Sequence, residues 1–418
     1  MKKFLFILII IVLLFLATII IYISIFKDQD EENTDNLTTQ LQSQSQNDSA
    51  LLEAATSTKE DTVLNIIRVS NNSDLDAPYD IDTEAGKVKR IFNGRRINIS
   101  IIGVDSRLGS SYKHADANHV LSLLLDEGKI EITSIPRDTP CDAKQEDSTQ
   151  NKLTVLYPAL GRNAYLKEVA KIAELDQIHY WIELNFSQAR GILELLGFKN
   201  SGTTLQMLRS RTVIADNDYQ RVYNQAQFIK QVILKHFDKM TGFFAPILIR
   251  GGLTIVNSNI TYSIAENLLK QLKNSGFPKN PDDIIIRIRP PIKIKYKIYD
   301  YFDETTLKLL TQKIENHSSH SATFTIDQNY IIRKLEYALL KAEKDTNSPN
   351  KIIYNLKTLF DQKAWLQVED LNKREQIRDK FYNLIYNAYL KKNQQSQADE
   401  IKKQFEAEKK LFETPIFQ

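Results

Sequence analysis

The stretch "INISIIGVDSRLGSSYKHADANHVLSLLLDEGKIEITSIPRDTP" (residues 97–140) decides the fold. Residues 97–102 alternate in polarity and predict a strand. The runs 119–125 and 129–135 are apolar, flank the turn DEGK and predict a hairpin. The residues before the hairpin are rich in Gly, Ser, Asp and Asn, which is typical of a loop. Three strands of one sheet are therefore expected here.

Helices and strands alternate after this stretch. Residues 161–175 and 187–197 predict helices, and residues 178–185 predict a strand between them. Residues 63–70 are a candidate for a further strand at the start. This alternation predicts an α/β fold with a mixed central sheet flanked by helices. The carboxyl ends of such strands are where ligand-binding loops collect.

The first residues predict a membrane segment. Residues 4–26 carry no charge and are long enough to span a bilayer core of about 30 Å. A cleaved signal peptide would have a shorter apolar region and a small-residue cleavage site. Lys2 and Lys3 precede the segment and acidic residues follow it, so the positive-inside rule places the N-terminus in the cytoplasm and the bulk outside.

The last hundred residues predict an all-α region. Four amphipathic segments, 331–344, 350–362, 375–393 and 397–412, are separated by short breaks. Short connections favour antiparallel helical hairpins, similar to a tetratricopeptide array. This region is either a structural bundle or a docking site for another protein. The predicted division of the chain is 1–26 (cytoplasmic start and anchor), 27–90 (polar linker), 91–317 (α/β domain) and 318–418 (helical domain).

Composition excludes several classes of protein. The net charge of the 418-residue chain is only +3, so no general field attracts nucleic acid, and none is expected as a partner. The single cysteine, Cys141, cannot form an intrachain disulfide. No Cys/His cluster has the spacing of a zinc site.

Acidic and basic residues mark the loop positions of the predicted sheet. Asp105 and Asp116, on the predicted loop, could hold a hard cation such as Mg²⁺ together with phosphate oxygens. Loop aspartates more often cap turns, so this signal is weak alone. Arg137 follows the hairpin directly, where it is either a surface ion pair or a phosphate ligand.

A second basic group follows further along the chain. Arg209 and Arg211 are two residues apart and point to the same side if the segment is extended. Asp218, Arg221 and Gln225 form one stripe at the start of a helix, an end that favours anions. The plain alternative is a solvated face with an Asp–Arg pair, which contributes little.

In order, the strand, "DSR", the second aspartate, "IPRDT", "LRSR" and "DNDYQRVYNQ" resemble the LytR–CpsA–Psr family over about residues 95–315. The resemblance implies a bacterial, membrane-anchored phosphotransferase that acts outside the cytoplasmic membrane. Such an enzyme moves a glycopolymer from a polyprenyl-pyrophosphate carrier to peptidoglycan or another wall acceptor, with Mg²⁺ as cofactor.

The resemblance assigns expected roles to individual residues of this chain that match the family motifs. The resemblance implies Mg²⁺ ligands at Asp105 and Asp116. It also implies a catalytic set around the pyrophosphate that comprises Asp105, Arg107, Asp116, Arg137, Arg209, Arg211, Asp218 and Arg221. Further substrate-binding positions are His114, Lys152, Asn224 and Gln225. Arginine forks suit pyrophosphate because they bind its oxygens bidentately and stay charged.

The chain departs from the family pattern at two positions. His114 and Asn224 stand where arginines are usual. Two missing cations motivate a second hypothesis, a non-catalytic binder of polyprenyl pyrophosphate that regulates envelope assembly. A third hypothesis is an anchored scaffold that acts through its C-terminal helices.

Overall fold

The computed structural model describes residues 79–81, 94–106, 108–215, 217–319, 327–345 and 347–414. The predicted membrane segment 4–26 and the predicted strand 63–70 lie outside these residues, as does most of the linker. Within the part described, no helix is both long and apolar enough to cross a membrane.

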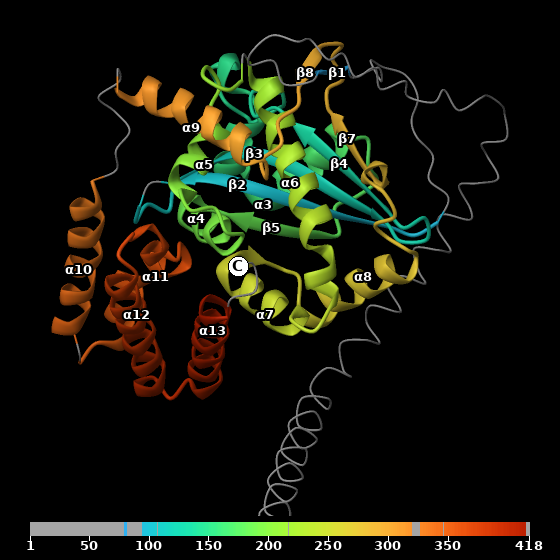
Figure 1. The fold of residues 1–418 in the computed structure, drawn as a ribbon. Coiled ribbons are helices and arrows are strands. Elements are labelled where there is room, and N and C mark those ends of the chain that lie inside the picture. The colour runs from blue at the N-terminus through green and yellow to red at the C-terminus, as the bar shows by residue number, and fades with distance from the viewer. Residues whose placement is uncertain are drawn as a thin grey trace, which may run out of the picture.

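The centre of the molecule is a mixed sheet (Figure 1). Its described strands follow the order β6-β5-β2-β3-β4-β7. The strands are β2 (Arg96–Ser106), β3 (Lys113–Leu124), β4 (Lys129–Ile135), β5 (Tyr180–Leu184), β6 (Asn257–Ser258) and β7 (Ile284–Ile288). The central three strands are antiparallel, while β5 and β7 pair in parallel with β2 and β4. A separate two-stranded ladder pairs β1 (Tyr79–Ile81) with β8 (Lys295–Lys297). The predicted mixed α/β class is confirmed.

The predicted loop between the first two strands is mostly strand. Pairing of β2 with β3 runs from Arg96↔Leu124 to Ser106↔Lys113, with an irregularity at Gly103/Val104. The prediction that Asp116 lies on a loop was therefore wrong. Gly, Ser, Asp and Asn favour turns in isolation, but here partners on β2 hold most of them extended. Asp116 itself is the extra residue at the irregularity, between Ala115 and Ala117, which pair with Val104 and Gly103.

Helices cover both faces of the sheet. Apolar residues of α6 and α8 pack on one face with Ile99, Leu123 and Ile132. Residues of α3 pack on the other face with Ile102 and Val120. The helices of this part are α3 (Leu153–Ile172), α4 (Phe186–Leu195), α5 (Ser201–Arg209), α6 (Asp218–Thr241), α7 (Ala245–Ile255), α8 (Tyr262–Asn274) and α9 (Glu304–Ser319), with the 3-10 turns η1 (Ser148–Gln150) and η2 (Pro281–Asp283).

Helix α3 begins earlier than predicted. It starts at Leu153 and contains Pro158, and it is interrupted at Gly161, whose φ of 79° and ψ of 175° are not helical. The prediction, which began at residue 161, captured the second segment only. The first segment was not predicted as helix because it contains Pro158 and ends at Gly161, and both residue types normally interrupt helices.

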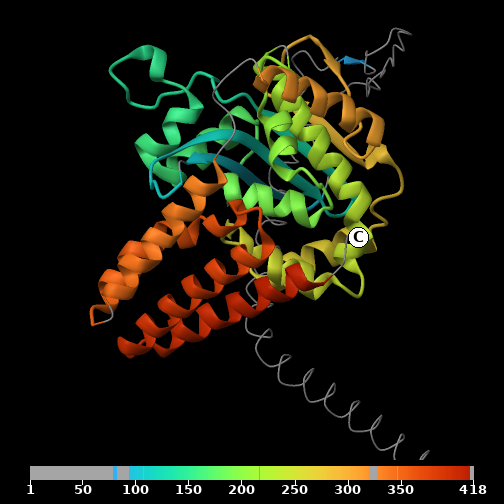
Figure 2. The same ribbon diagram turned by 60° about the vertical axis from the view of Figure 1, so that its left-hand side comes forward.

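Four helices form the C-terminal region, as predicted. They are α10 (Gln328–Lys344), α11 (Pro349–Asp361), α12 (Leu371–Lys391) and α13 (Gln395–Glu413), with the 3-10 turn η3 (Ala364–Gln367). Consecutive helices pack against each other, and Figure 2 shows them side by side beneath the sheet. A surface groove lined by Phe360, Ile385 and Ile401 runs among α11, α12 and α13. Docking of another protein to this region stays a prediction.

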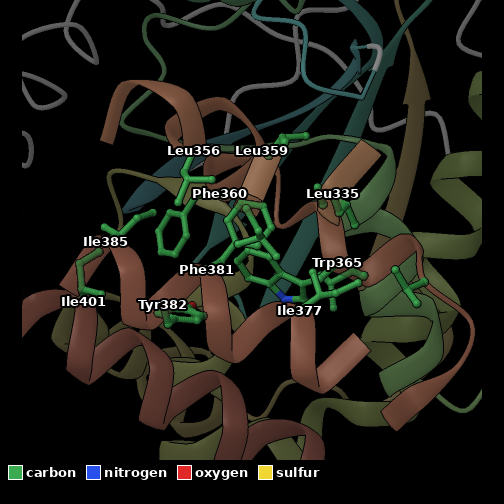
Figure 3. Close-up of a cluster of buried hydrophobic side chains, with 14 of the residues drawn as sticks. Leu335, Leu356, Leu359, Phe360, Trp365, Ile377, Phe381, Tyr382, Ile385 and Ile401 are labelled. Atoms are coloured by element: carbon green, nitrogen blue, oxygen red, sulfur yellow. The ribbon is translucent and has the colours of Figure 1, made fainter. Parts of the chain in front are cut away.

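The core of these helices continues into the α/β part. Trp365 is fully buried among Phe381, Ile377 and Tyr382 (Figure 3). The same core includes residues of α7 and, partly buried, Ile192 of α4. The predicted domain boundary at residue 318 is therefore bridged by one continuous hydrophobic core.

Candidate functional site

The turn after β4 is docked onto the start of α6. The backbone N–H of Arg137 donates to Asp218 Oδ2 at 3.2 Å. Asn217 caps α6, and its side chain accepts from Gln220 N at 2.9 Å. The cap leaves Asp218 in the first helical turn, where a carboxylate is favoured by the helix dipole. Two segments far apart in sequence are thus fixed at one point.

Arg137 lies between two carboxylates. Its Nη1 contacts Asp116 Oδ1 at 2.7 Å, and its Nε lies 3.7 Å from Asp138 Oδ2. Thr154, at the start of α3, also donates to Asp116 Oδ1, at 3.3 Å. Lys152 contacts Asp138 Oδ1 at 3.3 Å. Asp116 and Asp138 therefore hold the guanidinium from two sides.

Arg211 and Arg221 share the carboxylate of Asp218. Their Nε and Nη2 atoms lie 3.5 Å and 2.7 Å from Asp218 Oδ1. Arg211 also reaches Asp138 Oδ2, at 3.5 Å, and Arg221 donates to the backbone oxygen of Asp116, at 3.3 Å. Burial raises the pKa of Asp218 and lowers the pKa of Arg221. We call Asp116, Arg137, Asp138, Lys152, Arg211, Asp218 and Arg221 the arginine–carboxylate cluster.

Arg209 makes a separate pair. It ends α5 and contacts Asp105 Oδ1 at 3.2 Å. The prediction that Arg209 and Arg211 share one side of an extended segment was wrong, because helix α5 continues to Arg209 and the chain then bends. The two arginines instead contact different carboxylates, Asp105 for Arg209 and both Asp138 and Asp218 for Arg211. Asp105 nevertheless lies opposite His114 on the ladder, two residues from Asp116 along β3.

A buried chain of polar side chains supports the cluster from the sheet side. Because His119 is neutral, its Nε2 donates to Gln225 Oε1 at 3.1 Å while Ser134 Oγ donates to its Nδ1 at 2.6 Å. Gln225 Nε2 donates in turn to Leu208 O at 2.9 Å. Burial lowers the pKa of His119 to about 4. Gln225, predicted to bind substrate, thus connects the sheet to the end of α5.

The remaining predicted residues are placed differently. Arg107 lies outside the described residues. His114 is half-buried, with its Nδ1 3.4 Å from Thr154 O. Asn224 is only 1% exposed, and its Oδ1 accepts from Gln220 Nε2 at 2.7 Å. The side chain of Asn224 is thus hydrogen-bonded within α6.

The cluster has buried guanidinium nitrogens that form no hydrogen bond: Arg137 Nε, Arg211 Nη2 and Arg221 Nε. The first two have only ion-pair contacts with Asp138 Oδ2, at 3.7 Å and 3.5 Å. Buried donors normally find partners, and leaving them without one costs free energy. An anion with several oxygens supplies such partners, and Arg137 and Arg211 remain about one third exposed to admit it. The cluster therefore has donors to which an anion could bind.

The carboxylates fit Mg²⁺ in part. Asp105 and Asp116 stand on adjacent strands and offer the oxygen ligands that Mg²⁺ takes. Both are also paired with arginines, and within the part described no group of three or more His, Cys, Asp or Glu side chains is arranged to hold a metal. Two carboxylates suffice only when water and phosphate oxygens complete the coordination.

Sequence reasoning missed several supporting residues. Asp138 and Thr154 were not among the predicted site residues, although Asp138 directly follows Arg137. The C-terminal region contributes two more, since Gln362 and Lys334 contact the segment after Asp105. Asp138 could have been found from its position beside the strand-end arginine. Nothing in the sequence around Gln362 or Lys334 indicates that these residues contact the segment after Asp105.

The fold is thus a mixed sheet with arginines and carboxylates gathered beyond its strand ends. Residues 37–197 match the model of the LytR_cpsA_psr family, which confirms the family resemblance that the motifs predict. The residues from Arg209 to Gln225 lie beyond the matched region. No curated protein matches the chain.

Solved structures match about half of the chain at low sequence identity. TagV from B. subtilis has 19% sequence identity and a TM-score of 0.38, over 54% of this chain and 98% of that chain. Lin1025 from Listeria innocua has 14% identity and a TM-score of 0.36, over 55% and 99%. TagT, in a structure bound to LIIa-WTA, has 16% identity and a TM-score of 0.34, over 55% and 94%.

Proposed function

We propose that the protein is a membrane-anchored phosphotransferase that moves a glycopolymer from a polyprenyl-pyrophosphate carrier to a cell-wall acceptor, peptidoglycan or another polymer. The family match supports a cell-wall glycopolymer transferase in general terms. The single observation that carries the proposal is the set of buried guanidinium nitrogens in one cluster that form no hydrogen bond. A pyrophosphate bears several negative oxygens, which suit such donors.

The reaction exchanges one phosphorus–oxygen bond for another. An acceptor hydroxyl oxygen bonds to the phosphorus that carries the glycopolymer, and the bond from that phosphorus to the bridging pyrophosphate oxygen breaks. Polyprenyl phosphate leaves, and the hydroxyl proton passes to water. Arg137, Arg211 and Arg221 would bind the non-bridging oxygens and stabilise the charge that spreads over them in the transition state.

The carboxylates of the site have two roles in this proposal. Asp218 and Asp138 hold the guanidinium groups in place, because each contacts two of them. Asp105 and Asp116 would hold Mg²⁺, which neutralises phosphate charge when bound. Together these residues position the pyrophosphate, and positioning supplies much of the catalysis in phosphoryl transfer.

The location outside the cytoplasm is also a proposal. It rests on the uncharged residues 4–26 and on the lysines before them. A reporter fused after Gln418 should be active only outside the cytoplasm. Activity of a cytoplasmic reporter at that position would contradict both the location and the access to a wall acceptor.

Lysine substitution at the cluster tests the transferase. We expect Arg221→Lys to lower transfer from a polyprenyl-pyrophosphate-linked disaccharide at least about tenfold, because a point charge cannot copy a bidentate fork. Arg95→Lys is the matched control, since Arg95 pairs with Asp126 at the other end of β2. Equal transfer by both variants would exclude the cluster as the active site.

The non-catalytic binder remains a second candidate. His114 and Asn224, which replace the expected arginines, are the observation that favours it. If the protein is such a binder, calorimetry should show binding of polyprenyl pyrophosphate, and an assay with Mg²⁺ should show no transfer. Transfer by the purified protein would eliminate this candidate.

A further inference from the structure

The turn between α6 and α7 displays two aromatic rings to solvent. Phe243 is 91% exposed and Phe244 is 37% exposed. Their ring centroids lie 5.3 Å apart at an interplanar angle of 80°. A nearly fully exposed phenylalanine leaves a large apolar surface in water, which burial would remove favourably.

Backbone hydrogen bonds fix the turn that exposes Phe243. Gly242 ends α6 and Phe244 is the N-cap residue of α7. The N–H of Ala245 donates to Gly242 O at 3.0 Å, and the N–H of Leu248 donates to Phe244 O at 3.0 Å. The turn is therefore held between two helices, and it keeps Phe243 outward.

Basic side chains surround the turn. Lys239 lies in the last turn of α6, and the exposed Lys273 donates to Thr241 O at 3.5 Å. Arg250, exposed on α7, lies over the Tyr262 ring with its guanidinium carbon 3.8 Å from the centroid. Within residues 235–245 the charged side chains are Lys235, Asp238 and Lys239, so this stretch carries a net positive charge.

We propose that this turn, residues 241–245, contacts the surface of an anionic lipid bilayer. Aromatic rings settle at the level of the headgroups, and lysine and arginine are attracted to anionic lipids. A single short insertion binds only weakly, so the turn orients a protein that is held at the membrane by another signal. The exposed aromatic pair and the basic surroundings carry this inference, independently of the transferase proposal.

The contact is separate from the arginine–carboxylate cluster. Arg221 lies in the first turn of α6, whereas Phe243 follows the last turn of this 24-residue helix. At 1.5 Å per residue the two ends are about 36 Å apart. Substitutions in the turn should therefore leave phosphate binding unchanged, and the two proposals can fail separately.

Fluorescence quenching by brominated lipids tests the contact in the full chain reconstituted in phosphatidylglycerol bilayers. The variant Phe243→Trp places a reporter in the turn, and Tyr354→Trp, at a site that is 84% exposed on α11, is the matched control. Emission of the unsubstituted chain corrects for Trp181 and Trp365. We expect brominated phosphatidylglycerol to quench the reporter at 243 at least twofold and the reporter at 354 hardly at all.

Reversing the charge of the two lysines beside the turn is a second test of the same contact. Lys239→Glu combined with Lys273→Glu should reduce the quenching at 243, as should replacement of the anionic lipid by phosphatidylcholine. Equal quenching at positions 243 and 354, or none at 243, would overturn the proposal. A blue shift at 243 without quenching would mean that a protein, either a partner or a second copy of this chain, covers the turn, and this also overturns it.

Discussion

The side chain of Gln362 accepts a hydrogen bond from the backbone N–H of Gly109 at 2.8 Å, although 253 positions separate them. Gln362 Nε2 also donates to Ser110 O at 3.0 Å and to Ser106 Oγ at 3.3 Å. Lys334 Nζ donates to Leu108 O at 2.5 Å. The C-terminal helices thus hold the segment that directly follows Asp105.

Removal of this clamp should loosen the segment. We expect Gln362→Ala to speed hydrogen exchange of the Gly109 amide about fivefold, because one hydrogen bond contributes about 1 kcal/mol. Mass-spectrometric exchange measures the change, with Gln395→Ala as control, because Gln395 bonds only locally to Asp399, at 2.8 Å. Unchanged exchange at Gly109 would show that the clamp does not order the segment.

The metal role of Asp105 predicts loss of Mg²⁺-dependent activity. We expect Asp105→Ala to lower transfer at least about a hundredfold, in the range of several kcal/mol that a metal supplies. The side chain of Asp105 is half exposed, so thermal unfolding should stay close to that of the unsubstituted protein. Retained activity with normal melting would rule out this role.

An arginine at position 114 should strengthen anion binding. His114 is half-buried beside Thr154, so an arginine there can reach the cluster, and one charged hydrogen bond adds about 1–2 kcal/mol. Titration with a polyprenyl-pyrophosphate analogue should show about tenfold tighter binding by His114→Arg. Asn224→Arg is the contrast, because position 224 is buried and a new charge there should lower stability. Weaker binding by His114→Arg would mean that the site suits a different head group.

Acid should destabilise the protein through His119. Its pKa is about 4 in the folded state against 6.5 for an ordinary histidine, so the unfolded state binds more protons between these values. The free energy of unfolding should fall as the pH drops from 6.5 to 4, by at most about 3 kcal/mol from this group. His236, whose pKa is also lowered to about 4, adds to the fall.

Denaturant titrations across this pH range measure the effect. In His119→Gln the fall should be smaller, since glutamine does not titrate. An equal fall in both proteins would assign the acid sensitivity to other groups.

Two neighbouring glycines of α7 should respond oppositely to alanine. A Cβ at Gly251 would lie 2.6 Å from Leu411 Cβ, whereas a Cβ at Gly252 meets no atom within 4 Å. Gly251→Ala should therefore cost about 1–3 kcal/mol by overpacking, and Gly252→Ala should stabilise by up to about 1 kcal/mol. Thermal unfolding compares the two. Equal changes in thermal stability for the two variants would show that α13 does not pack tightly against α7 at Gly251.

Local patterns predicted the elements that repeat or alternate. The hairpin 119–135, the helix stripe of Asp218 and Arg221, and the four C-terminal helices all have periods that sequence displays directly. Asp116 was misplaced because the residues around it favour a loop in isolation, whereas β2 pairs with its neighbours Ala115 and Ala117, and that pairing is set by tertiary structure. Arg209 was misplaced because the end of α5 depends on packing.

Contacts between distant residues were not predictable from one sequence. Asp138 meets Arg211 and Lys152 only after three segments fold together, and Gln362 meets Gly109 across most of the chain. No periodicity or spacing encodes such pairs. The site motifs could thus be found, but not the residues that hold them.

The core around Trp365 has a consequence for how this gene can change. Leu366 packs so closely on α4 that a Cβ at Gly191 would lie 2.8 Å from its Cδ1. Recombination that exchanged the last helices for those of a distant relative would bring surfaces that do not fit α4 and α7. Substitutions on the two sides of this interface should therefore covary among related proteins.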